Sequence, residues 1–210
     1  MHNPPALTAA VAAIHNLAIP FRSLIYRASH LRDYSSFPAA QPLFCGPAGV
    51  LGSRYVAPSG PAALYLAGDA DTAFQEFNQF FYRTARGMHG RALVRHGNLR
   101  PDPCVTLGVY VRLSRLLDLT RSQRGKQTRR QLGISNRSDR ELLQPWAGIA
   151  NAPTSVLGTE VFNDGFFEGI VYPSAQNRGH ICFVLFPARL LATSQVHFHD
   201  AVTNITGSLP

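Results

Sequence analysis

Short apolar runs rich in β-branched and aromatic residues constrain the fold of this 210-residue chain most. Runs of this kind predict buried strands, and Gly or Pro residues bound several of them. Helical periodicity occurs in stretches before and between the runs. The sequence therefore predicts an α+β fold, a single domain in which helices flank a central sheet that is mixed or antiparallel. The strands are predicted over 24–28, 62–67, 105–113, 169–172 and 181–186.

Two helices are predicted from periodicity and capping residues. Apolar side chains at helical spacing indicate an amphipathic helix over 5–17, which Pro20 is expected to end. Asp71 or Thr72 can cap a second helix that runs to Phe81. The apolar positions of the first helix are Leu7, Val11, Ile14 and Leu17.

Arginine supplies nearly all of the positive charge. The chain has 20 Lys plus Arg against 12 Asp plus Glu, a formal net charge of +8, and Lys126 is its only lysine. The guanidinium fork binds phosphates and carboxylates, so the bias fits a dinucleotide, a nucleic acid or an acidic protein as partner. A GC-rich genome would produce the same bias. The basic segment 120–140, predicted as a short helix and loop, is the natural place for a partner contact.

Cysteine usage and the N-terminus indicate the compartment. The cysteines, Cys45, Cys104 and Cys182, are odd in number and widely spaced, with no Cys/His ligand cluster, so we expect no metal site. A reducing cytoplasm is the simplest location. The N-terminal residues lack a basic segment, and polar residues and Pro20 interrupt their apolar stretch. We therefore expect neither a signal peptide nor a membrane-spanning helix, and no membrane contact.

Several familiar motifs are absent. The glycines at 46, 49 and 52 have the wrong spacing for a dinucleotide fingerprint, Gly125-Lys126 lacks the upstream glycine of a P-loop, and G-x-S-x-G does not occur. His197-x-His199 has no third metal ligand at a recognisable spacing, which favours a solvated segment. The Gly- and Pro-rich stretch 31–61 is predicted to be a loop, and loops of this length tend to be functional.

Five short motifs remain, and their order resembles the RES family, which is named for its Arg, Glu and Ser. The resemblance covers about residues 22–190. It divides the chain into an N-terminal helical segment (1–21), a RES domain (22–190) and a C-terminal tail (191–210) that packs on the domain or extends from it. In order, the motifs are YRAS (26–29), GSRY (52–55), ALYLAGDADTAFQEF (63–77), LDLT (117–120) and VYPSAQNRGHICFVLFP (171–187).

The resemblance implies a fold related to ADP-ribosyltransferases and a toxin that binds NAD⁺ and cleaves its nicotinamide–ribose bond. The enzyme would be a glycohydrolase or phosphorylase, or would transfer ADP-ribose to a protein. NAD⁺ is then the substrate, no further cofactor is expected, and inorganic phosphate is a candidate co-substrate. The family also implies neutralisation by a cognate Xre-like antitoxin. The expected assembly is a homo-oligomer or a toxin–antitoxin hetero-oligomer.

Arg27, Arg54 and Glu76 are the charged residues of the expected site. Guanidinium groups match the oxygens of a pyrophosphate, although each arginine could instead form a surface or structural ion pair. Glu76 could bond ribose hydroxyls or shield positive charge that develops at the anomeric carbon. An exposed helix glutamate is the alternative, but the apolar neighbours of Glu76 favour function, because an unpaired carboxylate among them would be costly. Arg27 and Glu76 are expected to be catalytic.

The remaining expected site residues are aromatic or neutral. Tyr65 is the third residue expected to be catalytic: its ring could stack on nicotinamide while its hydroxyl bonds a ribose or Glu76. Alternatively, Tyr65 could be a tyrosine of the core. Ser174 could bond nicotinamide or a phosphate, or brace its own turn. Tyr55 and His180 complete the binding set, with His180 near the position where the family often has Asn.

Two other functions compete with NAD⁺ cleavage. The +8 charge and the basic segment motivate a nucleic-acid-binding module, but no recognised DNA- or RNA-binding motif supports direct binding. A catalytically inactive relative that acts only as a binding partner is the second alternative. The presence of all five motifs argues against it.

Overall fold

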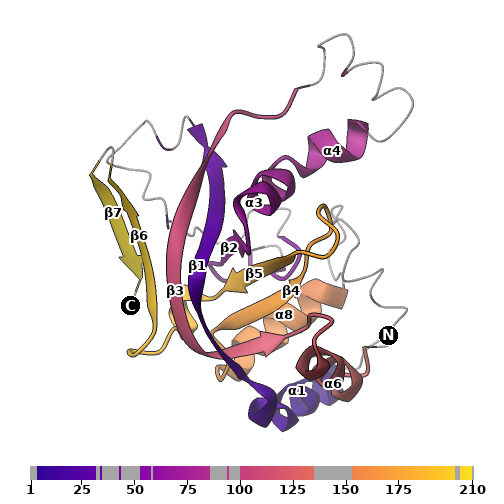
Figure 1. Ribbon diagram of the computed structural model, residues 1–210. Coiled ribbons are helices and arrows are strands. Elements are labelled where there is room, and N and C mark those ends of the chain that lie inside the picture. Colours follow the sequence, from indigo (N-terminus) through magenta and orange to yellow (C-terminus); the bar gives the residue numbers. More distant parts are fainter. Residues whose placement is uncertain are drawn as a thin grey trace.

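The computed structural model of this chain describes residues 4–31, 34, 43, 53–57, 59–85, 94, 100–134, 153–201 and 204–209. Figure 1 gives the arrangement of these segments. The helices are α1 (Pro4–Ala13), η1 (His15–Leu17), α3 (Ala70–Phe77), α4 (Gln79–Ala85), α6 (Gln123–Gln131), α8 (Pro153–Asp164) and η3 (Pro187–Arg189). The strands are β1 (Ile19–His30), β2 (Leu64–Ala67), β3 (Cys104–Asp118), β4 (Gly169–Pro173), β5 (Ile181–Leu185), β6 (Gln195–Asp200) and β7 (Ile205–Leu209).

The pairing of the strands closes a ring. β1 pairs with both β2 and β3, β2 pairs with β5, β5 with β4, and β4 with β3. Only the β3–β4 pair is parallel among these, so the predicted mixed sheet flanked by helices is confirmed. β6 extends the sheet from β3, and β7 pairs with β6. Figure 1 shows β1 and β3 running side by side over most of their length.

Alternation along the strands separates two hydrophobic cores. Ile25 of β1 and Val109 of β3 lie directly opposite each other and belong to a core whose buried members, among the described residues, come from strands and Leu43. The other core contains strand residues such as Val184 together with buried residues of α1, α3 and α8. Because successive strand residues point to opposite faces, one core fills the ring and the other lies under the helices.

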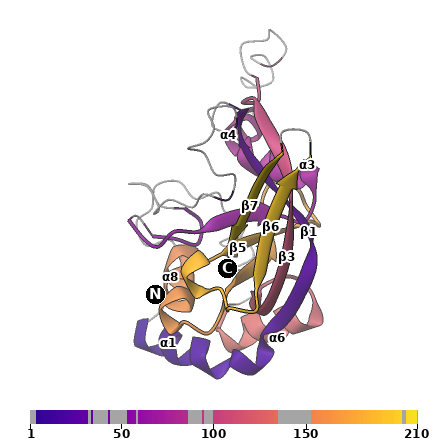
Figure 2. The same ribbon diagram turned by 90° about the vertical axis from the view of Figure 1, so that its left-hand side faces the viewer.

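The N-terminal helix is confirmed, but its end differs from the expectation. Its predicted apolar positions are all buried. The α-helix stops at Ala13, η1 follows, and Pro20 lies within β1. The register between β1 and β3 shifts between Ile19 and Phe21, so Pro20 sits at an irregularity where a missing N–H is tolerated. Figure 2 shows α1 and α6 together at one end of the molecule.

The helix after β2 begins earlier than predicted and is divided in two. Asp69, rather than Asp71 or Thr72, is the N-cap, and its carboxylate accepts the N–H of Thr72. Asn78 interrupts the helix, and α4 follows it. The capping prediction was wrong because several neighbouring residues are good caps, and only the fold selects one.

The C-terminal segment is part of the sheet. In β6, Val196 and Phe198 are buried while His197 and His199 are exposed, which gives the strand one core face and one solvent face. The buried carboxylate of Glu168 helps to anchor the loop that leads into β6, because it accepts the N–H of Leu191 and the hydroxyl of Ser194. The sequence did not predict β6, β7 or α8.

Two expectations fall partly outside the described residues. The predicted loop 31–61 is described only at 31, 34, 43, 53–57 and 59–61, and the basic segment only up to 134. In the described part of that segment, α6 forms as predicted. None of the described helices is long and apolar enough to cross a membrane.

Gly158 allows α8 to approach the backbone at Tyr55 closely. A Cβ atom at position 158 would lie 1.9 Å from the Tyr55 carbonyl oxygen. We therefore expect Gly158→Ala to lower the free energy of unfolding by about 2–3 kcal/mol, although alanine favours a helix by about 1 kcal/mol over glycine. Urea unfolding measures the change.

Gly108→Ala is the matched control, because its Cβ would meet only the Leu24 side chain, at 3.3 Å. A change of less than about 1 kcal/mol is expected there. Equal effects of the two substitutions would contradict the close approach at Gly158.

Candidate active site

A cavity of about 430 Å³ opens between α3 and the sheet. Its floor is a row of residues on neighbouring strands. Tyr26 pairs with Ala67, Ala67 with Cys182, and Cys182 with Tyr172, and all four line the cavity. The row therefore crosses β1, β2, β5 and β4 on the face that α3 covers.

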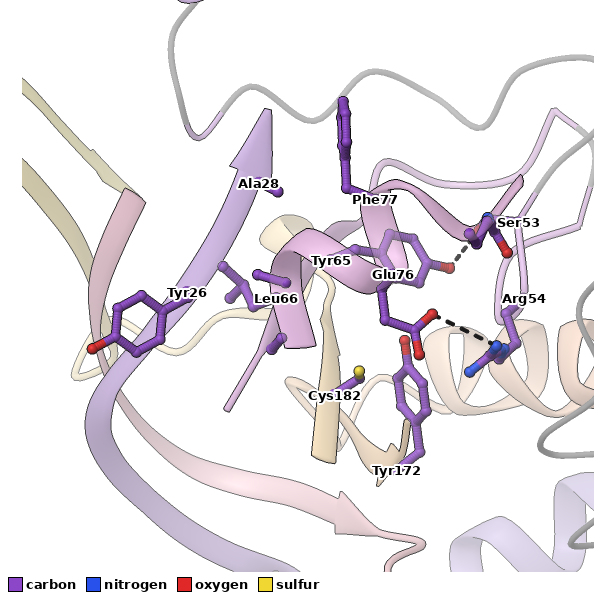
Figure 3. A pocket seen from close by; sticks show the side chains of 13 residues that line it. Tyr26, Ala28, Ser53, Arg54, Tyr65, Leu66, Glu76, Phe77, Tyr172 and Cys182 are labelled. Atoms are coloured by element: carbon purple, nitrogen blue, oxygen red, sulfur yellow. Dashed lines mark hydrogen bonds and ion pairs between the residues drawn. The ribbon is translucent and has the colours of Figure 1, made fainter. Parts of the chain in front are cut away.

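One face of α3 supplies the opposite wall. Ala73, Glu76 and Phe77 line the cavity, and their i, i+3, i+4 spacing places them on the same side of the helix. Figure 3 shows the Glu76 carboxylate directed toward Arg54 and Tyr172. Asp69 at the N-cap and Asp71 in the first turn suit the positive end of the helix dipole.

One oxygen of Glu76 is saturated with hydrogen bonds. Oε1 accepts the hydroxyl of Ser174 at 2.6 Å and the backbone N–H groups of Ala175 at 2.8 Å and Gln176 at 3.2 Å. The other oxygen, Oε2, lies 3.9 Å from Nη2 of Arg54. The turn after β4 thus holds one side of the carboxylate and leaves the other side facing the cavity.

Arg54 is carried by a tight turn that Tyr65 fixes. Ser53 and Val56 exchange backbone hydrogen bonds across the turn. The Tyr65 hydroxyl shares a hydrogen bond with Ser53 and accepts the N–H of Tyr55 at 3.3 Å. This hydroxyl therefore positions the turn, and Tyr65 is also one of the residues that line the cavity.

The guanidinium of Arg54 is buried and only partly satisfied. Its side chain is 8% exposed, and Nη1 has no hydrogen-bond partner among the residues that the structure describes. Its central carbon lies 5.4 Å from the centroid of the Tyr172 ring. Burial lowers the pKa of Arg54, but Tyr172 and Glu76 offset this and hold the pKa above its ordinary value. The site therefore holds a permanent buried cation next to a carboxylate.

Arg27 does not line this cavity. Its neighbours Tyr26 and Ala28 do, and alternate residues of a strand point to opposite faces. Arg27 is paired with Leu107, which belongs to the core inside the ring. The structure thus separates Arg27 from Arg54 and Glu76.

Ser174, His180 and Tyr55 surround the cavity without lining it. The buried Ser174 hydroxyl donates to Glu76 and accepts the N–H groups of Gln176 and Asn177, so its bonding capacity is used within the turn. His180 lies at the start of α3, where Nδ1 is 2.7 Å from Asp69 Oδ2. Tyr55 is fully buried against Tyr172, and its hydroxyl has no hydrogen-bond partner in the described part of the chain.

Sequence reasoning missed Tyr172 and Cys182. Burial raises the pKa of the Cys182 thiol well above its ordinary value, with Glu76 adding to the shift, and burial does the same for Tyr172. Both are therefore neutral walls of the cavity. Their alternation with Val171 and Phe183 on apolar strands was the available signal, but the cross-strand register could not be read from it.

The comparisons with known proteins agree with this architecture. A family model described as the RES domain matches residues 24–203. A chain in the crystal structure of the M. tuberculosis MbcT–MbcA toxin–antitoxin complex is similar, with a TM-score of 0.59 and 16% sequence identity over 97% of this chain and 92% of that chain. At this identity the likeness concerns the fold. No curated protein matches the sequence.

The N-cap predicts a pH dependence of stability. Partial burial raises the pKa of Asp69, but the hydrogen bonds with Thr72 and His180 lower it by more. The pKa of Asp69 therefore lies below its ordinary value of 3.8. A lowered pKa in the folded state stabilises the protein above the unfolded pKa, and this contribution is lost as pH falls through the folded value. Asn is also a good N-cap, so Asp69→Asn removes mainly the charge.

At pH 7 we expect the free energy of unfolding of wild type to exceed that of Asp69→Asn by about 0.3–1 kcal/mol. The difference should shrink as the pH falls below 3.8 and vanish below the pKa of Asp69 in the folded protein. Urea unfolding at a series of pH values measures it. A difference that stays constant to the acid end of the series would contradict the assigned charge effect.

Proposed function

The chain belongs to the RES domain family, and from that premise we propose that it is the toxin of a toxin–antitoxin pair that binds NAD⁺ in the cavity beneath α3 and cleaves the nicotinamide–ribose bond. The single observation that carries the proposal is the arrangement of Glu76 and Arg54 at this cavity, with one oxygen of Glu76 anchored and the other facing the cation.

The cavity offers the groups that NAD⁺ requires. Its pyrophosphate needs a cation, and Arg54 is buried with Nη1 available to an anionic ligand. Its rings need apolar walls, which Tyr65, Tyr172 and Phe77 supply. A volume of about 430 Å³ falls within the range of small-molecule sites. Arg54, rather than Arg27, is the cation that the geometry favours here.

Glu76 would act on the ribose through Oε2. Cleavage breaks the bond between the anomeric carbon and the nicotinamide nitrogen, and the electron pair leaves with nicotinamide, which becomes neutral. Positive charge then develops on the ribose, and a fixed carboxylate stabilises it more in the transition state than in the substrate. Because three donors hold Oε1, the carboxylate needs little reorganisation during the reaction.

The acceptor of ADP-ribose is water, inorganic phosphate or a protein side chain. Any of these adds to the anomeric carbon after nicotinamide departs, and water or a hydroxyl also loses a proton. For the partner we propose an Xre-like antitoxin, and the fold similarity to a chain of the MbcT–MbcA toxin–antitoxin complex supports a protein partner. The exposed Arg124, Lys126 and Arg130 of α6 suit an acidic antitoxin surface.

The experiment is to incubate the purified chain with NAD⁺ and measure nicotinamide release, with and without inorganic phosphate. Wild type should release nicotinamide, and Glu76→Gln should lower kcat at least about 100-fold while keeping an oxygen for the turn to bond. Arg54→Ala should raise KM because the cation is lost. Arg27→Ala tests whether a residue outside the cavity contributes.

Gln75→Ala is the matched control, since Gln75 precedes Glu76 but bonds Asp71 away from the cavity. It should keep wild-type activity, and thermal unfolding verifies that each variant folds. Loss of activity in Arg27→Ala with full activity in Arg54→Ala would overturn the assignment of the cation. If wild type is inert, also with candidate protein acceptors, the enzyme proposal fails and duplex-DNA binding becomes the function to test.

A further inference from the structure

One stripe of α3 faces the turn between β4 and β5. Asp69, Thr72 and Glu76 follow an i, i+3, i+7 spacing, which places them on the same side of the helix. Each bonds a different residue of the turn 174–180, and the order along the turn is antiparallel to the order along the helix. The contacts of Asn177 with Thr72 and of His180 with Asp69 place the start of α3 beside this turn.

Three side-chain contacts make up this arrangement, which we call the clasp. They are His180 Nδ1 to Asp69 Oδ2 at 2.7 Å, Asn177 Nδ2 to Thr72 Oγ1 at 2.9 Å, and Ser174 Oγ to Glu76 Oε1 at 2.6 Å.

Asn177 occupies the middle of the clasp and joins it to the site. Its side-chain amide donates to Thr72, and its backbone N–H donates to the Ser174 hydroxyl at 2.9 Å. Thr72 is fully buried, and its own hydroxyl donates to Asp69 at 2.7 Å. The buried Thr72 hydroxyl therefore donates one hydrogen bond and accepts another, so it is satisfied.

The position of the turn decides how Glu76 is held. Two of the three donors to Oε1 are backbone N–H groups, of Ala175 and Gln176, and their direction changes only if the turn moves. A side-chain hydroxyl such as that of Ser174 can rotate to follow a carboxylate, whereas backbone donors cannot.

We propose that Asn177 and Thr72 are positioning residues for Glu76. The bond between them sets the turn against α3 so that the N–H groups of Ala175 and Gln176 meet Oε1, and Oε2 remains directed at Arg54. The catalytic part of this inference rests on the proposed function. The structural part concerns only how the backbone N–H groups of Ala175 and Gln176 are held, and it can be tested without NAD⁺.

The test uses Asn177→Ala, Thr72→Val and the double variant, with Thr72→Ser as the conservative change. Thr159→Val is the matched control, because the Thr159 hydroxyl also bonds a helix oxygen, that of Ser155 at 2.9 Å, but in α8. Amide hydrogen exchange of Ala175 and Gln176, relative to core amides, reports on the turn. Nicotinamide release from NAD⁺ gives kcat and KM.

Exchange of the two amides should accelerate at least about tenfold in Asn177→Ala and Thr72→Val, with core amides unchanged. The kcat of Asn177→Ala and of Thr72→Val should fall between about 10-fold and 100-fold, and KM should change less than about threefold. A displaced carboxylate lowers the rate of the chemical step more than it weakens substrate binding. The double variant should lose less kcat than the product of the two single losses, since both substitutions remove the bond between Asn177 and Thr72. The loss is not that of one single variant, because Asn177→Ala also removes the contact with Asp71 and Thr72→Val the bond to Asp69. Thr72→Ser should restore wild-type values.

Unchanged exchange at Ala175 and Gln176 in both single variants would overturn the inference, whatever the activity. Accelerated exchange with unchanged kcat would overturn the positioning role, and so would an equal loss of kcat in Thr159→Val. If wild type does not cleave NAD⁺, the proposed function fails separately, and the exchange of the two amides still decides whether the clasp holds the turn.

Discussion

The hydrogen bonds to Oε1 of Glu76 are the interaction on which the rest of the site depends. A carboxylate between an apolar helix face and a buried thiol needs partners, because an unsatisfied charge there costs several kcal/mol. Ser174, Ala175 and Gln176 provide them from a turn that is distant in sequence. The turn thereby fixes which oxygen faces the cavity. The order of the two oxygens, rather than the presence of a glutamate alone, gives the site its chemistry.

Arg54 depends on a second, separate support. The turn that carries it is held by the Tyr65 hydroxyl on one side and by the close approach of Gly158 on the other. Its guanidinium is desolvated, interacts with Glu76 at 3.9 Å, and has one nitrogen without a partner in the described residues. A buried cation left in this state is stabilised by an anionic ligand, which is the electrostatic reason to expect a phosphate group beside it.

The sequence predicted those parts of the site that local signals determine. Glu76 was expected in a helix and Ser174 in a turn after a strand, and both lie there. Because α3 ends at Phe77, however, Glu76 lies in its last turn and not in an early turn as expected. Register is a non-local property, so the row from Tyr26 to Tyr172 across four strands could not be anticipated. The side of β1 on which Arg27 stands follows from alternation with Tyr26 and Ala28, but only once the covered face is known. α8 was missed because glycine and polar residues break up its apolar pattern.

The central claim is that NAD⁺ binds in the cavity beneath α3, in contact with both Glu76 and Arg54. The most direct measurement is a crystal structure of the Glu76→Gln variant grown with saturating NAD⁺. The account predicts the nicotinamide ribose in contact with residue 76 and the pyrophosphate on the guanidinium of Arg54. NAD⁺ bound on the other face of β1 at Arg27, or an empty cavity at saturating NAD⁺, would contradict it.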